Sequence, residues 1–143
     1  MDDISVVALF CSDVREEKGN TVTIVGVLPD NLNVPKLPGA LPKLCVYVRI
    51  HMGVDVDPGT MYTRLVMDGK ELGRIDMQKT VVDAARAKSK DSGKAYAGLI
   101  STFVMSPLAI VKPGLMEALV MVRGKEIVAG SLYLNEVPQP QPA

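Results

Sequence analysis

The stretch Ile4–Leu28, ISVVALFCSDVREEKGNTVTIVGVL, decides the predicted fold. Two apolar runs flank a charged loop that contains Gly19, and this pattern predicts an N-terminal β-hairpin. In the first run both alternating faces are apolar, so we expect a strand that is central in its sheet or covered on both sides. Phe10 and Ile24 are accordingly expected to pack in the core.

The charged loop between the two runs is the part of this stretch that could recognise another molecule. We identify a candidate partner-docking loop consisting of Asp13, Arg15, Glu16, Glu17 and Lys18. The alternative is a solvated hairpin loop, whose ion pairs contribute less than about 1 kcal/mol each. The sequence alone leaves both interpretations open.

Alternation and turn residues predict about eight short strands along the chain. Their expected ranges are 4–12, 21–28, 43–52, 60–67, 70–77, 95–106, 115–122 and 126–134. In 43–52 we expect one alternating set to face the core, namely Leu44, Val46, Val48 and Ile50. The other set is expected to face outward or towards a partner, namely Cys45, Tyr47, Arg49 and His51. The proline-rich segment 29–42 predicts an extended crossover between two sheets. Residues 78–94 are either a helix or a long loop, and we favour one or two helical turns.

These strands predict an all-β fold, an antiparallel two-sheet β-sandwich of the immunoglobulin-like or C2-like kind with at most one short helix. A length of 143 residues suits one domain. We place this domain at residues 1–137 and a Pro/Gln-rich tail at residues 138–143. Asp68-Gly69, between two alternating runs, is the clearest hairpin turn.

Composition limits the classes of partner. Sixteen basic and sixteen acidic residues cancel, so there is no basic excess for nucleic acid or for anionic lipid. No apolar run approaches the roughly 18 residues of a membrane-spanning helix. The acidic start and short apolar run of residues 1–11 do not fit a signal peptide, and we expect synthesis in the cytoplasm.

The N-terminal pattern resembles a family of functionally uncharacterised bacterial proteins. The matching residues are Ala8-Leu9-Phe10-Cys11, Asp13-Val14-Arg15-Glu16-Glu17, Gly19 and Ile24-Val25-Gly26-Val27. The segment from Lys112-Pro113-Gly114 to Gly124-Lys125-Glu126-Ile127 is similar to the family's closing hairpin. The resemblance implies a β-sandwich of C2-like or immunoglobulin-like type. It implies no activity and transfers no functional residues.

Few residues offer catalytic or metal-binding chemistry. His51 is the single histidine, and a hydrolase would need a nucleophile and an orienting carboxylate beside it. Asp55 and Asp57 share one loop and are weak candidates for calcium, although turn aspartates commonly bond their own backbone. Because no signal peptide is expected, Cys11 and Cys45 are expected to be free thiols, and a disulfide would be possible only if their strands were neighbours.

We therefore expect a non-enzymatic structural or protein-interaction module without a cofactor. It would be a subunit of a larger assembly, for example a virion decoration or accessory protein, and its partners would be copies of itself or the larger particle. The alternatives are a C2-like ligand- or calcium-binding module through Asp55 and Asp57, and a hydrolase that uses His51.

Overall fold

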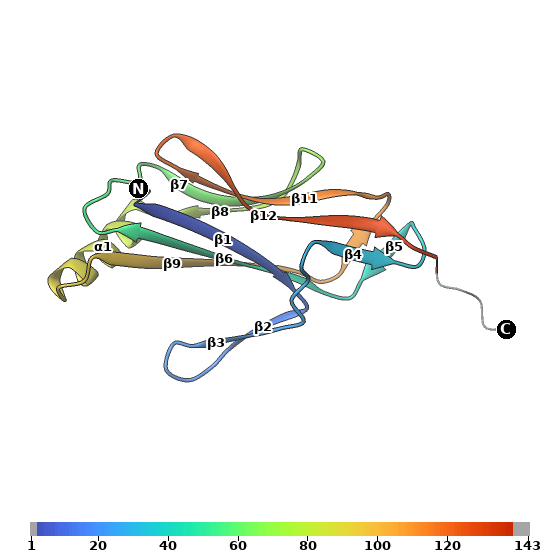
Figure 1. Cartoon of the computed structure of the whole chain (residues 1–143), viewed down its shortest axis with the longest axis horizontal. Helices are drawn as coiled ribbons and strands as arrows, with labels where there is room; N and C mark the ends of the chain where they lie inside the picture. The colour runs from blue at the N-terminus through green and yellow to red at the C-terminus, as the bar shows by residue number, and fades with distance from the viewer. Residues whose placement is uncertain (1–2, 139–143) are drawn as a thin grey trace.

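The computed structural model describes residues 3–138, and in this part of the chain it contains twelve strands and one helix (Figure 1). The elements are β1 Ile4–Cys11, β2 Asp13–Glu16, β3 Val22–Val25, β4 Asn31–Val34, β5 Gly39–Leu41, β6 Leu44–Gly53, β7 Met61–Met67, β8 Lys70–Met77, α1 Lys79–Asp91, β9 Tyr96–Met105, β10 Leu108–Ile110, β11 Gly114–Val122 and β12 Lys125–Glu136. The predicted mostly-β fold is confirmed, with twelve strands in place of about eight.

Two larger sheets form two layers, and residues of both contribute to one hydrophobic core (Figure 1). The first sheet has the order β1-β6-β9, and the second has the order β4-β12-β11-β7-β8. Every pairing in these sheets is antiparallel except that of β12 with β4. Two small sheets, β5 with β10 and β2 with β3, complete the described structure.

The strand β6 is the centre of the first sheet, and its sequence LCVYVRIHMG explains why. Its residues Leu44, Val46, Val48 and Ile50 point inward as predicted, and each is at most 1% exposed. The β-branched side chains on this inward side, and the aromatic Tyr47 on the other, suit a pleated surface. β6 pairs with β1 on one side and β9 on the other without a register shift.

The predicted hairpin over residues 4–28 is wrong in its pairing. β1 is an edge strand that pairs with β6, and it meets the segment after β3 only where the Leu28 N–H donates to the Phe10 carbonyl (2.8 Å). Pairing with β6 keeps Phe10 2% exposed in the core, whereas Ile24 is only half-buried. The charged loop and the start of the second run instead form a separate small hairpin, β2–β3.

The predicted hairpins β7–β8 and β11–β12 are confirmed, and the backbone geometry of their turns explains why they form. Asp68 and Gly69 between β7 and β8 have φ values of 50° and 84°. Arg123 and Gly124 between β11 and β12 have φ values of 51° and 73°. Two successive positive φ angles are the geometry of a type I′ turn, which matches the twist of paired strands.

The segment 78–94 is a helix, α1, of thirteen residues, longer than the one or two turns predicted. Lys79 and Asp83 form an i,i+4 ion pair (Nζ···Oδ2 2.8 Å), and the Gly93 N–H donates to the Lys90 carbonyl (2.9 Å) as the helix ends. Gly93 has a positive φ, as is usual after a helix C-terminus. Of the predicted tail, residues 139–143 lie outside the described residues.

Close packing between β1 and β12 gives a test of this arrangement. A Cβ atom at Gly130 would lie 2.7 Å from the Ala8 carbonyl oxygen, which is part of a backbone that cannot yield easily. Gly130→Ala is therefore expected to lower the free energy of unfolding by about 1–3 kcal/mol. Urea denaturation measures this change.

The matched control is Gly98→Ala in β9, where the nearest heavy atom to the new Cβ is the Ile50 carbonyl oxygen at 3.9 Å. Its free energy of unfolding should stay within about 0.5 kcal/mol of the wild type. Equal effects of the two substitutions would contradict the close approach of β12 to β1.

Candidate functional site

The hairpin β2–β3 projects from the first sheet, and we call residues 13–25 the arm (Figure 1). The chain leaves β1 at Ser12, whose N–H donates to the Val25 carbonyl (2.9 Å) where the arm returns. Gly26 follows with a φ of 67°, and the Ser12 side chain occupies the space that a Cβ atom would need. This junction therefore requires glycine, for both backbone conformation and space.

Asp13 fixes the base of the arm to the sheet. Its carboxylate accepts hydrogen bonds from Lys43 Nζ (2.6 Å), just before β6, and from Arg15 Nε (3.1 Å). The hydrogen bond from Lys43, followed by that from Arg15, lowers the pKa of Asp13 below its ordinary value of 3.8. Asp13 and Arg15 of the predicted docking loop are thus engaged within the molecule.

The rest of the predicted docking loop lies at the end of β2 and the tip of the arm. The Glu17 N–H donates to the Thr21 carbonyl (2.8 Å), and Thr23 Oγ1 donates to the Glu17 carboxylate (3.2 Å). The ion pairs that the arm forms in the described structure both use Asp13. Glu16 and Glu17 therefore offer carboxylates that are not neutralised by a nearby cation of residues 3–138.

The register of the first sheet defines its outer face. Three rows of side chains cross it in the order β1, β6, β9: Val7–Arg49–Ile100, Leu9–Tyr47–Thr102 and Cys11–Cys45–Val104. Along β6, Cys45 and Tyr47 were predicted to face outward and are nevertheless buried, because the arm begins above this end of the sheet. Arg49 is exposed, and His51 is half-buried.

A groove of about 670 Å³ lies between the arm and the outer face of β9. The arm contributes Val14, Glu16, Glu17, Asn20, Thr21 and Val22, and β9 contributes Ile100, Thr102 and Val104. Ile100 and Val104 are 55% and 59% exposed, which is high for large apolar side chains in the middle of a strand. The groove has an apolar floor and an acidic rim.

The sequence analysis identified the acidic rim but missed the floor. Three of the five predicted docking residues, Asp13, Arg15 and Lys18, are not part of the groove lining, and only Glu16 and Glu17 are. The β9 residues belong to a strand that was expected, but their place beneath the arm depends on contacts far apart in sequence. The available signal was the absence of charge in residues 96–105.

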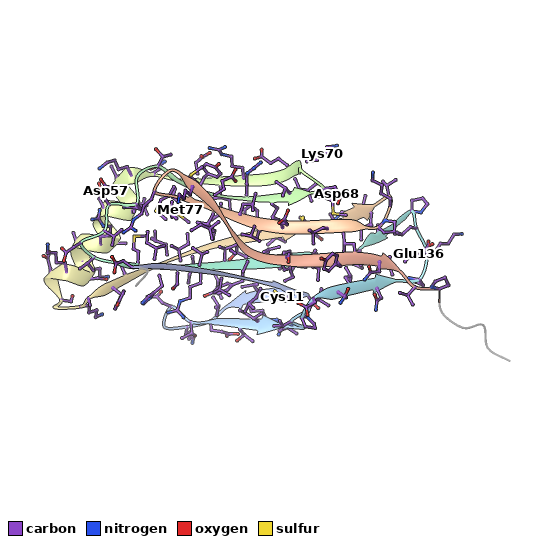
Figure 2. All side chains as sticks on the ribbon, turned by 45° about the horizontal axis from the view of Figure 1, so that its top comes forward. Cys11, Asp57, Asp68, Lys70, Met77 and Glu136 are labelled. Atoms are coloured by element: carbon purple, nitrogen blue, oxygen red, sulfur yellow. The ribbon has the colours of Figure 1, made fainter. Side chains whose placement is uncertain are left out.

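The other candidate residues lie elsewhere and do not converge. Asp57 lies at the α1 end of the molecule, whereas Cys11 lies at the base of the arm (Figure 2). Asp55 pairs with Lys90 (2.7 Å), and the Asp57 carboxylate accepts a hydrogen bond from the Gly59 N–H (3.0 Å). In the described part of the chain, no three His, Cys, Asp or Glu side chains gather in a way that could hold a metal ion.

His51 makes an aromatic contact with Tyr96 of β9. The ring centroids are 4.6 Å apart and the planes differ by 22°, so the rings stack. Tyr96 belongs to β9, two residues before Gly98, which lies directly opposite His51. His51 is therefore engaged with an aromatic ring, and Asp55 and Asp57 have other partners.

Cys11 and Cys45 lie directly opposite each other in β1 and β6, which meets the condition that their strands be neighbours. Both are fully buried free thiols. The Cys11 thiol donates to the Cys45 carbonyl (Sγ···O 3.7 Å), and burial raises the pKa of Cys11 above its ordinary value. The thiols therefore form part of the packed base beneath the arm.

These features define a β-rich domain with a projecting arm and an open groove. The chain belongs to the family of unknown function DUF6941, which matches residues 6–135. The predicted membership of an uncharacterised family is thereby confirmed. No curated protein matches the chain. Among residues 3–138, no helix has both the length and the apolar character needed to cross a membrane.

The ion pair at the base of the arm should make stability depend on pH through Asp13. Because its folded pKa is lowered, ionised Asp13 stabilises the fold above pH 3.8, and this contribution is lost as pH falls through the lowered value. Asp13→Asn is expected to be less stable than the wild type at pH 7, with the difference vanishing in acid. Urea denaturation at several pH values measures the difference.

Lys43→Gln provides the control, since it removes the principal partner of the Asp13 carboxylate. In this background Asp13→Asn should have a smaller effect at pH 7. A difference between wild type and Asp13→Asn that stays constant down to pH 2 would contradict the role of the ionised carboxylate.

Burial of both thiols predicts that they are protected in the native state. Ellman's reagent should react slowly with the folded chain and should titrate two thiols once guanidinium unfolds it. Gly26→Ala, which disturbs the base of the arm, should accelerate the native reaction. Rapid labelling of both thiols in the wild-type native protein would contradict the described packing.

Proposed function

We propose that this protein is a non-enzymatic protein-interaction module, a β-sandwich of immunoglobulin-like or C2-like type that serves as a subunit of a larger assembly. The observation that carries the proposal is the open apolar groove between the arm and β9. A virion is one example of such an assembly. Partner proteins or further copies of the chain would contact the outer face of the first sheet.

Exposed apolar side chains on the outer face of the first sheet support this assignment. Val7, Ile100 and Val104 are each more than 40% exposed on the outer face of the same three-stranded sheet. Contiguous apolar surface in water is unfavourable, and where it is retained it commonly marks an interaction site. A partner that covers this face would remove that surface from water.

The outer face of the second sheet has a different character around β7. There Arg64 forms two hydrogen bonds with Glu126 (2.6 and 2.8 Å), and the Arg74 guanidinium lies 3.8 Å from the centroid of the Tyr62 ring. Such paired and stacked charges suit contact with water. Because β12 of the second sheet also exposes Val128 and Tyr133, the groove, and not apolar exposure alone, favours the first sheet as the docking surface.

The interactions of the carboxylates and of His51 also support a binding role. The carboxylates of Asp13, Asp55 and Asp57 are engaged with lysines or a backbone N–H, and His51 stacks on Tyr96. Groups held in this way act as structural supports. We therefore assign the activity of the protein to its surface and not to acid–base chemistry.

Site-specific photo-crosslinking in cells that produce the protein tests the proposal. Benzoylphenylalanine replaces Ile100 in the groove in one version of the full chain, and Val128 of β12, on the second sheet, in another. Ile100 and Val128 are 55% and 51% exposed, so the two positions are matched in accessibility. Irradiation is expected to give a discrete protein adduct from position 100 that is absent, or at least about fivefold weaker, from position 128.

Mass spectrometry of the adduct identifies the partner as another protein or as a second copy of the chain. The absence of any adduct from position 100, or equal adducts from both positions, would overturn the proposed docking surface. An adduct with a nucleic acid or a lipid in place of a protein would also overturn it.

A further inference from the structure

The outer edge of β9 is the longest regular strand edge that the described structure leaves without a partner strand. β9 pairs with β6 over ten consecutive residues, from Gly53 opposite Tyr96 to Leu44 opposite Met105, without a bulge. On its other side no strand of residues 3–138 pairs with it. Its backbone N–H and C=O groups on that side therefore have no partner strand among these residues.

The sequence of β9 lacks the features that usually protect such an edge. YAGLISTFVM has no charged residue and no proline over ten residues. Proteins normally block exposed edges with lysine, proline or a bulge, because a free edge pairs readily with any extended chain. An unprotected edge of this length is expected where a partner strand is meant to bind.

The other edges of the two larger sheets show how this protein protects a strand. β8 carries Lys70, Glu71, Arg74 and Asp76, and its register with β7 shifts at a bulge. β1 is uncharged like β9, but it lies close to β12, where Gly130 approaches the Ala8 backbone. β4 is only four residues long. The edge of β9 is the one that combines length, regularity and lack of charge.

The groove beside this edge indicates the chemistry of the missing strand. A strand added to β9 would place alternate side chains next to Ile100, Thr102 and Val104, the floor of the groove. Apolar side chains would extend that floor. The rim above it carries Glu16 and Glu17, so a lysine or arginine in the added strand would find a complementary charge.

Arg49 is the basic residue nearest to these positions along the sheet, since it lies opposite Ile100. It lines a separate groove with Val7 and His51 on the β1 side of the outer face. The charged residues that line the groove beside β9 are therefore Glu16 and Glu17 of the arm. α1 lies against the N-terminal end of β9, so the half of the strand that contains Thr102 and Val104 is the accessible part (Figure 1).

We propose that an extended segment of a partner protein, with alternating apolar side chains and at least one basic residue, adds as a strand to the free edge of β9 beneath the acidic arm. This proposal rests on the proposed function and names the kind of partner that the docking surface takes. Backbone hydrogen bonds to β9 hold the segment. The groove selects its side chains.

The test uses the full chain and a capped decapeptide in which valine alternates with threonine. One central valine is replaced by lysine, so that the lysine shares a face with the other valines. Hydrogen-exchange mass spectrometry should show slower exchange of amides in residues 96–105 when the peptide is present. Fluorescence anisotropy of the labelled peptide measures its affinity. A peptide with glutamate in place of lysine should bind about threefold more weakly.

Three controls separate edge pairing from simple apolar contact. N-methylation of alternate peptide amides, which removes backbone donors, should abolish binding. Val104→Lys should weaken binding at least about tenfold, because a lysine on the edge strand repels the basic peptide and blocks pairing. Val128→Lys, at an equally exposed position on the second sheet, should bind the peptide as the wild type does. Both lysine variants are judged folded by their circular dichroism.

The acidic rim has its own test. The double variant Glu16→Gln with Glu17→Gln should bind the lysine and glutamate peptides equally, since the selective charge is gone. Retained threefold selectivity would show that the arm does not recognise the basic residue.

Unchanged exchange in residues 96–105, or equal binding of the N-methylated peptide, would overturn strand addition. A concentration-dependent dimer that protects β9 in the absence of peptide would also overturn it, because a second copy would then occupy the edge. If crosslinking from position 100 captures a protein but β9 is not protected by the peptide, only strand addition fails. If β9 accepts the peptide but position 100 gives no adduct, the proposed function fails by itself.

Discussion

The junction between β1 and the arm is the constraint on which the position of the groove depends. At this point Cys11 still lies opposite Cys45 in the sheet. The N–H of the next residue, Ser12, already donates a hydrogen bond to the Val25 carbonyl at the far end of the arm. Gly26 permits the close return because it has neither a side chain nor a preference against positive φ. The sheet, the arm and the groove between them are consequently positioned relative to one another by a few backbone contacts.

The two larger sheets meet water in different ways. On the second sheet, long side chains such as Arg64 and Arg74 cover the surface by pairing with carboxylates and an aromatic ring. On the first sheet, branched apolar residues such as Ile100 stand in the open next to a strand without charge. A protein that needed only solubility would gain from exchanging such residues for polar ones. β12 of the second sheet also exposes Val128 and Tyr133, so the two faces differ chiefly in the groove that the arm forms over β9.

Local signals in the sequence predicted the structure well, and distant pairings did not follow from them. Asp68-Gly69 determines a turn by its own backbone preferences, so the hairpin around it could be located directly. The partner of β1 could not, because residues 21–28 and 44–53 both alternate and only packing in the complete core selects between them. Tyr47 is buried against expectation for the same reason, since the arm that covers it is far away in sequence. Of the candidate site, Glu16 and Glu17 were identified, and the apolar floor was not.

The position of β12 has a consequence for how the chain reaches this fold. Among the described strands it is the last to leave the ribosome, yet it lies inside its sheet, between β4 and β11. Asn135 donates to the side chains of Asn31 and Asn33, 104 and 102 residues earlier. During synthesis β4 must therefore wait for nearly the whole chain, and loop closure over such a distance slows folding. Until then the nascent chain holds apolar strands without partners, a state in which exposed strand edges favour aggregation.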